Sequence, residues 1–499
     1  MASLLDLPDE TLENVLLCNI DGRTLHQLTR VNKRLRRIAS PILVQRWPYS
    51  HERLLLHLLH YPEFRTRVKE LKFEDLVPFR DHEEDHTGCD ISIESLEALA
   101  ATVDEAWPAL AKSTKWAEYI RKGNTDAVCT LLLCWTTKLS SLDITVPIFD
   151  ANRRHDLLVL QLASQVVRLW KKTGSTDLPL LQLRSVVFRH WDTEFSTDGR
   201  YAAPFFHLPN VKSFTSWKLG LWSWGEGSDG NYNDPTLGWV PPANPRENYI
   251  LDFPICTSPI EELILDEADV SVRSLSRVVS ACQRLKLLLY RPGPLCNNAW
   301  LSWRGLAKVM LRHKKSLETL FIDFERPGDS ILFTDDEVME SDGDDDVDGD
   351  GDDHRHNDDP EVGTIHLHDC YQYLKCLKSL SIDVSSLYKE DGYGDYQITP
   401  SRLPSSLVNL RLQGLCLTSL WKRSIQETED QLNDLQILIQ ECSPDGKLPN
   451  LRQINIAERL PEGLVLEAFD RLMELAKARG IKVIFIRLWE ERWAGIEQP

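Results

Sequence analysis

The chain has 499 residues, of which 42% are apolar and 27% are charged, and this composition is typical of a globular protein with a large core. The 11 cysteines form no CxxC pair and are odd in number, which excludes an ordinary secreted disulfide scaffold. The net charge is −19, but residues 335–359 hold 14 acids and one arginine, which leaves only −6 for the rest of the chain. Nothing in this composition predicts a nucleic-acid partner, which usually needs a basic face.

The N-terminal sequence has no basic region and reaches Asp6 almost at once, so we expect no signal peptide. The longest apolar runs, such as 128–135, are too short to span a bilayer. These features predict a soluble protein of the cytoplasm or the nucleus with no membrane partner.

Residues 4–47 are predicted to form three short helices. Leu7-Pro8-Asp9-Glu10 is typical of a helix N-terminus, and Asp21-Gly22 ends the first helix. Ser40-Pro41 is expected to end the second helix, so that the third begins at Ile42. Three short helices cannot bury all their apolar residues, and one face is therefore predicted to bind a partner.

Beyond this helical unit, an apolar pattern at positions i, i+3 and i+5 recurs along the chain, with a degraded copy at Val211 and Phe214. The complete copies are Val68-Leu71-Phe73, Leu139-Leu142-Ile144, Leu183-Val186-Phe188, Ile260-Leu263-Leu265, Leu285-Leu288-Tyr290, Leu317-Leu320-Ile322, Leu377-Leu380-Ile382, Leu407-Leu410-Leu412, Leu451-Ile454-Ile456 and Ile481-Ile484-Ile486.

Helical patterns separate several of these copies, at 156–172, 271–284, 303–313 and 463–479. A strand followed by a helix at this spacing is the period of a leucine-rich repeat, in which the i+3 and i+5 side chains point inward. The sequence therefore predicts an α/β fold with a small N-terminal three-helix unit. An irregular solenoid follows, with parallel strands inside and helices outside. The gaps from Val68 to Leu139 and from Leu139 to Leu183 fit this period badly.

This pattern divides the chain into four predicted regions. Residues 1–47 form the helical unit, residues 48–334 form the first part of the repeat array, and residues 363–499 form its C-terminal part. Residues 335–362 are acidic and of low complexity, and they are expected to be a disordered insertion. Residues 221–249, rich in Trp, Gly, Pro and Asn, are expected to be a long ordered loop.

The helical unit resembles the F-box family. The match rests on Leu7-Pro8-Asp9-Glu10, on the helix with Leu12, Val15 and Leu16, on Asp21 to Leu25, and on Val31-Asn32-Lys33-Arg34-Leu35. It covers about a tenth of the chain. With the repeats behind it, the whole chain looks like a fungal-type F-box protein with leucine-rich repeats. One departure is Leu16-Leu17-Cys18-Asn19-Ile20, which is less apolar than the family's usual end of the first helix.

The resemblance implies a non-catalytic subunit of an SCF-type ubiquitin ligase. The F-box would bind the small adaptor protein that bridges to a cullin, and the repeats would hold a protein substrate that the sequence does not identify. The resemblance implies that adaptor contacts fall among the apolar residues of the helices: Leu7, Pro8, Leu12, Val15, Leu16, Leu25, Leu28, Val31 and Leu35. Some of these must belong to the interior of the three-helix unit. The alternative is a repeat scaffold that binds a partner without delivering it for ubiquitination.

Other motifs favour plain structural interpretations, and we expect no catalytic residues, cofactor or metal. His82-Glu83-Glu84-Asp85-His86 lacks the helix that a zinc protease needs, and residues 225–230 lack the flanking strand and helix of a dinucleotide site. Residues 344–355 resemble a calcium loop but end in Arg355. The basic cluster Arg30, Lys33, Arg34, Arg36 and Arg37 is typical of a solvated helix face.

Four tryptophans are the candidates for a substrate-facing surface, because Trp is enriched at binding hot spots. They are Trp217, Trp222, Trp224 and Trp239. Core packing under a loop is the alternative interpretation of these residues.

Overall fold

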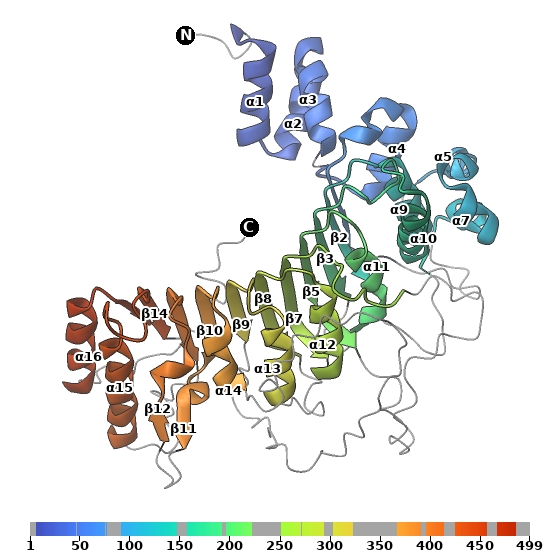
Figure 1. Cartoon of the computed structure of the whole chain (residues 1–499). Coiled ribbons are helices and arrows are strands. Elements are labelled where there is room, and N and C mark those ends of the chain that lie inside the picture. The colour runs from blue at the N-terminus through green and yellow to red at the C-terminus, as the bar shows by residue number, and fades with distance from the viewer. Residues whose placement is uncertain are drawn as a thin grey trace, which may run out of the picture. The chain divides into compact units, whose positions relative to one another are not determined.

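The computed structural model describes residues 6–45, 47–74, 76, 91–146, 157–191, 196–221, 251–270, 272–293, 303–322, 367–390, 396–413, 425–456 and 467–485. The chain divides into two compact units. The first comprises residues 1–260 with 281–283, and the second comprises residues 261–280 with 284–499. Both units are drawn in Figure 1.

The first unit begins with three packed helices, α1 (Asp9–Asn19), α2 (Gly22–Val31) and α3 (Lys33–Gln45). Their shared core holds Leu12, Leu16, Leu25, Leu35, Ile38, Ala39, Ile42 and Leu43. The predicted boundary at Ser40-Pro41 is wrong, because α3 runs through Pro41. The break lies instead at Asn32, which is extended and whose Oδ1 accepts a hydrogen bond from the Leu35 N–H at 2.8 Å. This bond satisfies one of the free N–H groups at the start of α3.

Next come α4 (His51–His60), the 3-10 helix η2 (Pro62–Arg67) and four parallel strands of the first unit. The strands are β1 (Glu70–Phe73), β2 (Ser141–Val146), β3 (Ser185–His190) and β5 (Ser213–Trp217), paired in that order. The long interval before β2 holds α5 (Ile93–Ala100), α6 (Val103–Ala106), α7 (Pro108–Ser113), α8 (Trp116–Arg121) and the fully buried α9 (Thr125–Trp135). These helices explain why the repeat period fails between Val68 and Leu139.

The rest of the first unit consists of one long helix and short elements. α10 (Leu158–Thr173) joins β2 to β3, as the pattern at 156–172 predicts. β4 (Thr197–Asp198) pairs with β6 (Leu219–Leu221), and η3 (Gly199–Tyr201) and α11 (Ala203–Phe206) follow β4.

The second unit is built on seven described parallel strands. They are β7 (Glu262–Val270), β8 (Leu287–Pro292), β9 (Thr319–Ile322), β10 (Ser379–Asp383), β13 (Asn409–Gln413), β14 (Gln453–Ile456) and β15 (Lys482–Phe485), paired in that order. The helices are α12 (Val272–Ala281), α13 (Trp303–Leu311), α14 (Leu367–Cys370), α15 (Ile425–Gln440) and α16 (Glu467–Ala478). The 3-10 turns η8 (Tyr371–Tyr373), η9 (Val384–Leu387) and η10 (Pro400–Arg402) and the antiparallel pair β11 (Tyr388–Glu390) and β12 (Tyr396–Ile398) complete it.

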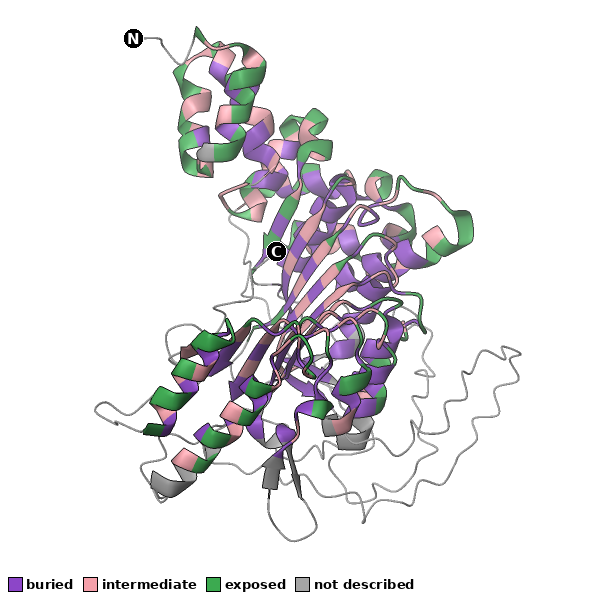
Figure 2. Cartoon of the chain, turned by 60° about the vertical axis from the view of Figure 1, so that its left-hand side comes forward, coloured by how far each residue is buried: buried purple, intermediate pink, exposed green. Residues whose placement is uncertain are grey.

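The recurring apolar triples form ladders of buried side chains across neighbouring strands. The residues paired in register in the first unit are Leu71, Leu142, Val186 and Phe214. Those paired in register in the second unit are Leu263, Leu288, Leu320, Leu380, Leu410 and Ile454. All ten are at most 6% exposed. Figure 2 shows the alternation of buried and partly exposed residues along the strands. The fold is therefore α/β, with packed N-terminal helices followed by parallel strands and helices that resemble leucine-rich repeats.

The last triple needs a correction of one residue. Val483 pairs with Ile454 and Phe485 with Ile456, whereas Ile484 pairs with Asn455 on the opposite side of the strand. In 481–486 every residue except Lys482 is apolar, so the alternation that fixes the register is missing from the sequence. Ile486 lies outside the described residues.

β7 contains a bulge that depends on one glycine. The register between β7 and β8 shifts between Leu265 and Ala268, and Glu267 within the bulge has a positive φ of 50°. The Gly293 N–H donates to the Ala268 carbonyl at 2.9 Å. A Cβ at position 293 would clash with the Asp269 carboxylate and would lie 2.5 Å from the Glu267 carbonyl oxygen. Only glycine permits this close approach.

Two predicted segments, residues 222–249 of the long loop and the acidic insertion 335–362, lie outside the described residues, so these predictions stay predictions. Among the helices that the structure describes, none combines the length and the apolar character that crossing a bilayer requires.

Candidate partner-docking surfaces

The start of α2 is fixed by its own capping residue. Asp21 Oδ1 accepts hydrogen bonds from the backbone N–H groups of Arg23 and Thr24 at 2.9 and 3.0 Å, and the Thr24 hydroxyl donates to Oδ2 at 2.6 Å. These bonds, the one from the Thr24 hydroxyl first, lower the pKa of the Asp21 carboxyl below its ordinary value. The ionised carboxylate also suits the positive end of the helix dipole. The Asp21-Gly22 break in the sequence is therefore a helix start with a defined geometry.

Arg34 holds the N-terminal turn against the first turn of α3. Its Nε donates to Asp9 Oδ1 at 2.8 Å, and its Nη2 donates to the Leu7 carbonyl at 2.5 Å. Arg37 forms an ion pair with the other oxygen of Asp9. Because Val31 lies three residues before Arg34, the Leu7-Pro8 turn and the junction of α2 with α3 occupy the same end of the helical unit.

The nine predicted adaptor contacts divide into two groups by burial. Leu12, Leu16, Leu25 and Leu35 are at most 5% exposed and form part of the core, so they do not offer a surface. Leu7, Val15 and Leu28 are half-buried, whereas Pro8 is exposed and Val31 is 64% exposed. Sequence alone does not separate these groups, because both follow the same helical spacing.

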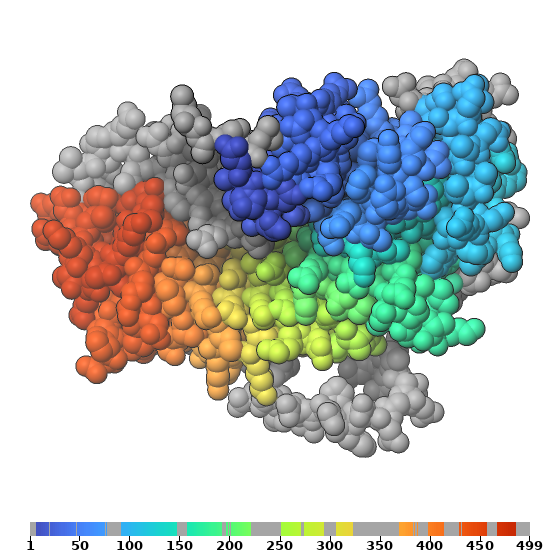
Figure 3. All heavy atoms as spheres, turned by 90° about the horizontal axis from the view of Figure 1, so that it is seen from above, coloured from blue at the N-terminus to red at the C-terminus, as the bar shows by residue number. Residues whose placement is uncertain are grey.

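Two further features of the helical unit are exposed to solvent. Leu17, 42% exposed, is a large apolar side chain on α1 that the sequence comparison with the F-box outline did not select. Of the basic cluster, Arg30, Lys33, Arg36 and Arg37 are exposed, as expected for a solvated helix face, whereas Arg34 is half-buried and bonded to Asp9 and Leu7. In Figure 3 the atoms of these helices form the dark blue surface near the N-terminus. We call Pro8, Val31 and the half-buried Leu7 and Leu28 the helical docking patch.

A second surface lies on the strands of the first unit, on the side opposite the buried ladder. Asp143 accepts two hydrogen bonds from Arg189, at 2.9 Å from Nε and 3.2 Å from Nη2, and pairs in register with Lys72 and Val187. Trp217 follows next to Arg189 in the register. The two charged groups neutralise each other, so their contribution to stability at this exposed position is at most about 1 kcal/mol.

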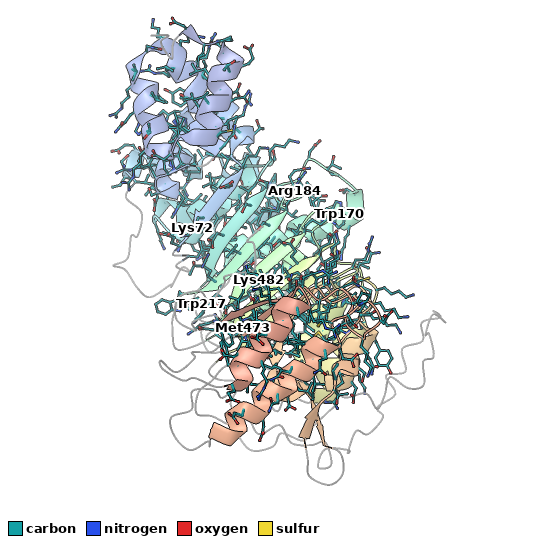
Figure 4. The ribbon with its side chains drawn as sticks, turned by 90° about the vertical axis from the view of Figure 1, so that its left-hand side faces the viewer. Lys72, Trp170, Arg184, Trp217, Met473 and Lys482 are labelled. Carbon is teal, nitrogen blue, oxygen red and sulfur yellow. The ribbon has the colours of Figure 1, made fainter. Side chains whose placement is uncertain are left out.

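Trp217 is the one substrate-facing candidate within the described residues. It is half-buried, and the Lys218 ammonium lies over its ring at 5.1 Å from the centroid. Its position beside Arg189 places it on the face away from the buried ladder, and in Figure 4 its labelled side chain projects from the strand, as does that of Lys72. Trp222, Trp224 and Trp239 lie outside the described residues.

The three rejected ligand motifs, at 82–86, 225–230 and 344–355, also lie outside the described residues. Within the part of the chain that the structure covers, no three His, Cys, Asp or Glu side chains gather in a way that suits a metal ion.

No family model matches the chain, and no curated protein matches it either. The surfaces described above are therefore the basis for any functional conclusion.

Proposed function

We propose that the chain is the substrate-recognition subunit of an SCF-type ubiquitin ligase. In this proposal the three N-terminal helices bind the adaptor, and through it the cullin, while the repeat strands bind the protein substrate. The chain itself performs no chemistry and acts by raising the effective concentration of the substrate near the ubiquitin-conjugating enzyme.

The observation that supports this proposal best is the helical docking patch. A helical unit that resembles an F-box leaves a 64% exposed Val31 and an exposed Pro8 at the same end, although it has a compact core of its own. Single exposed apolar residues are common on protein surfaces. Here, however, both belong to the set that the F-box resemblance selects, and Arg34 holds them at the same end.

The repeat strands support the proposed binding of a protein substrate. Solenoids present rows of side chains that are free to vary without disturbing the buried ladder, and such rows are used for binding partners. Lys72, Val187 and Trp217 occupy such rows in the first unit.

The test is co-purification with the purified SCF adaptor. We expect Pro8→Ala combined with Val31→Asp to abolish adaptor binding, because a charge would be buried at the contact. Both side chains lie outside the core, so the helical content and the melting temperature of the variant should stay close to those of the wild type.

The matched control is Ile93→Asp, since Ile93 is 76% exposed on α5 and belongs to no predicted contact. This variant should bind the adaptor as well as the wild-type chain does. A wild-type chain that does not bind the adaptor, or a patch variant that binds it normally, would refute the ligase proposal. The first result would favour the repeat scaffold.

A further inference from the structure

The strands of the second unit carry a row of side chains on the face opposite the buried ladder. Outward residues alternate with ladder residues along each strand, and strand pairing brings the outward ones into register. We call this set the outward row, and its members are Ile264, Leu289, Phe321, Ser381, Arg411, Asn455 and Ile484. Leu289, Phe321, Ser381 and Asn455 are buried, although they point away from the ladder.

The corresponding row of the first unit shows how far neighbouring strands by themselves cover such residues. Its members are Lys72, Asp143, Val187 and Thr215. Lys72 is exposed and the other three are half-buried. In the second unit, by contrast, Leu289 is 1% exposed and Phe321 is 7% exposed, although both side chains are larger than that of Val187. The outward row therefore has a cover in addition to its neighbours on the sheet.

The sequence of the central strands agrees with cover on both faces. β8 contains the run Leu287 to Tyr290 and β9 the run Leu320 to Ile322, and continuous apolar runs are typical of parallel strands that are buried on both sides. Helix α16 cannot be the cover of the outward row. Its Phe469 ring lies 5.3 Å from that of Phe485, and Phe485 belongs to the ladder face because it pairs with Ile456.

Two polar atoms on the outward face also indicate an occupant. The Ser381 hydroxyl oxygen and the Gln413 amide nitrogen are enclosed, and neither has a hydrogen-bond partner among the described residues. Gln413 lies two residues after Arg411 on β13 and so shares its face. Buried polar atoms nearly always have a partner. The cover over this face should therefore offer hydrogen-bonding groups as well as apolar side chains.

We propose that residues 486–499, which follow β15 directly, lie across the outward row and cover it. β15 contributes Ile484 to the row, so this stretch starts at one end of it. From β15 to β9 the sheet has four strand spacings, or about 19 Å. The 14 residues span about 46 Å when extended and about 21 Å when helical, so they reach Phe321 in either form.

The composition of 486–499 suits the outward row. Its residues Ile486, Trp489, Trp493 and Ile496 recur at the spacing of one apolar helix face. An indole N–H can donate to the Ser381 hydroxyl, and the carboxylates of Glu490 and Glu491 can accept from the Gln413 amide.

The acidic residues 335–359 would be a poor cover for the same row. Their carboxylates would lose hydration against Leu289 and Phe321. Any partner that uses the outward row must displace 486–499 first, so this stretch is a built-in competitor. The inference goes beyond the proposed ligase function and does not depend on adaptor binding.

Photocrosslinking in the full chain identifies the occupant. p-Benzoylphenylalanine is introduced at position 321, the protein is irradiated, and tryptic peptides are mapped by mass spectrometry. Cleavage after Arg487 and Arg492 yields peptides 488–492 and 493–499, and we expect the crosslink in one of these. The matched control has the same amino acid at position 187, in the first unit, and should not crosslink to either peptide. A crosslink from position 321 to another segment or to a second copy would overturn the proposal.

Accessibility of the row gives a second, independent measurement. In a Ser381→Cys chain, the introduced thiol should react slowly with iodoacetamide. Adding Trp489→Ser and Trp493→Ser should speed its labelling at least about tenfold, because the row is uncovered. The buried Cys370 should stay protected, which shows that the core remains closed.

The matched control for the tryptophan changes is Trp191→Ser, since Trp191 is an exposed tryptophan of the first unit. It should leave labelling at position 381 within about twofold. Labelling that is unaffected by the changes at 489 and 493 would overturn the proposal, also where the bulky amino acid at position 321 prevents folding.

Discussion

At the scale of single residues, Asp126 is a carboxylic acid enclosed in the first unit. It is 2% exposed, and its two oxygens accept hydrogen bonds from the backbone N–H groups of Leu158 and Val159 at 2.6 and 3.1 Å. It thus satisfies the start of α10 from within α9. Burial raises the pKa of its carboxyl from 3.8 to about 7, although the two backbone hydrogen bonds act in the opposite direction. The side chain therefore joins α9 to α10, and near neutral pH its ionised form is disfavoured by burial.

This cost predicts a pH dependence of stability. Because the pKa is higher in the folded than in the unfolded chain, the contribution of Asp126 is fully present below about pH 4 and is lost as the pH rises through about 7. The free energy of unfolding of the wild type, minus that of Asp126→Asn, should fall over this interval by on the order of 4 kcal/mol. Urea unfolding of both proteins at several pH values measures it. A difference that stays constant between pH 4 and 8 would contradict the assignment.

The predicted docking residues show that a helical sequence pattern does not determine which side chains are exposed. Leu35 and Val31 lie four positions apart in the F-box match, yet Leu35 is 3% exposed and Val31 is 64% exposed. Asn32 interrupts the helix between them, so the two side chains no longer share one helical face. The interruption depends on a local hydrogen bond that competes with continued helix, and such competition is weakly encoded in composition.

At the scale of elements, the repeat is carried by the i, i+3 and i+5 triples. Position i is buried in every described copy, including Val68, Leu139 and Leu407, and the next two positions form the ladders in every copy except the last. Strand positions were predictable because alternation with a period of two leaves a clear apolar signal. The helices α4 to α9, α11, α14 and α15 were not predicted; several of them, such as α6, α11 and α14, have only four residues, which is too short for a helical period to be recognised.

The ladder predicts that substitutions at two neighbouring residues of β13 destabilise the chain to very different extents. Leu410 is fully buried between Leu380 and Ile454, so Leu410→Ala should destabilise the chain by about 2–5 kcal/mol through lost contacts and a cavity. Asn409 is only half-buried and donates a long hydrogen bond of 3.3 Å to Ser379. Asn409→Ala should therefore cost less than about 1 kcal/mol. Equal losses in chemical unfolding would mean that the register is not the one described.

At the scale of the whole molecule, the described cysteines are free thiols that differ sharply in burial. Cys18 and Cys256 are exposed, whereas Cys129, Cys134, Cys282, Cys370 and Cys442 are buried. Burial raises the pKa of the Cys282 thiol to about 12 and that of the Cys442 thiol to about 11. Buried thiols therefore lack both access and the reactive thiolate form.

A short alkylation pulse tests this distribution. With iodoacetamide on the native chain at pH 8, followed by peptide mapping, Cys18 and Cys256 should be modified first. The five buried thiols should react only after unfolding. Rapid native labelling of Cys134 or Cys370, both buried, would show that the core opens far more often than this packing implies.

The sequence by itself determined the α/β repeat, the three N-terminal helices and the strand positions, because buried side chains impose strong periodic signals. It also supplied the F-box resemblance and hence the proposed function. Only the tertiary structure decided which docking residues are exposed, where α3 begins and the register of β15. The start of α3 depends on the local hydrogen bond of Asn32. Exposure and strand register depend on which residues become neighbours after folding, and the sequence does not indicate which distant residues these are.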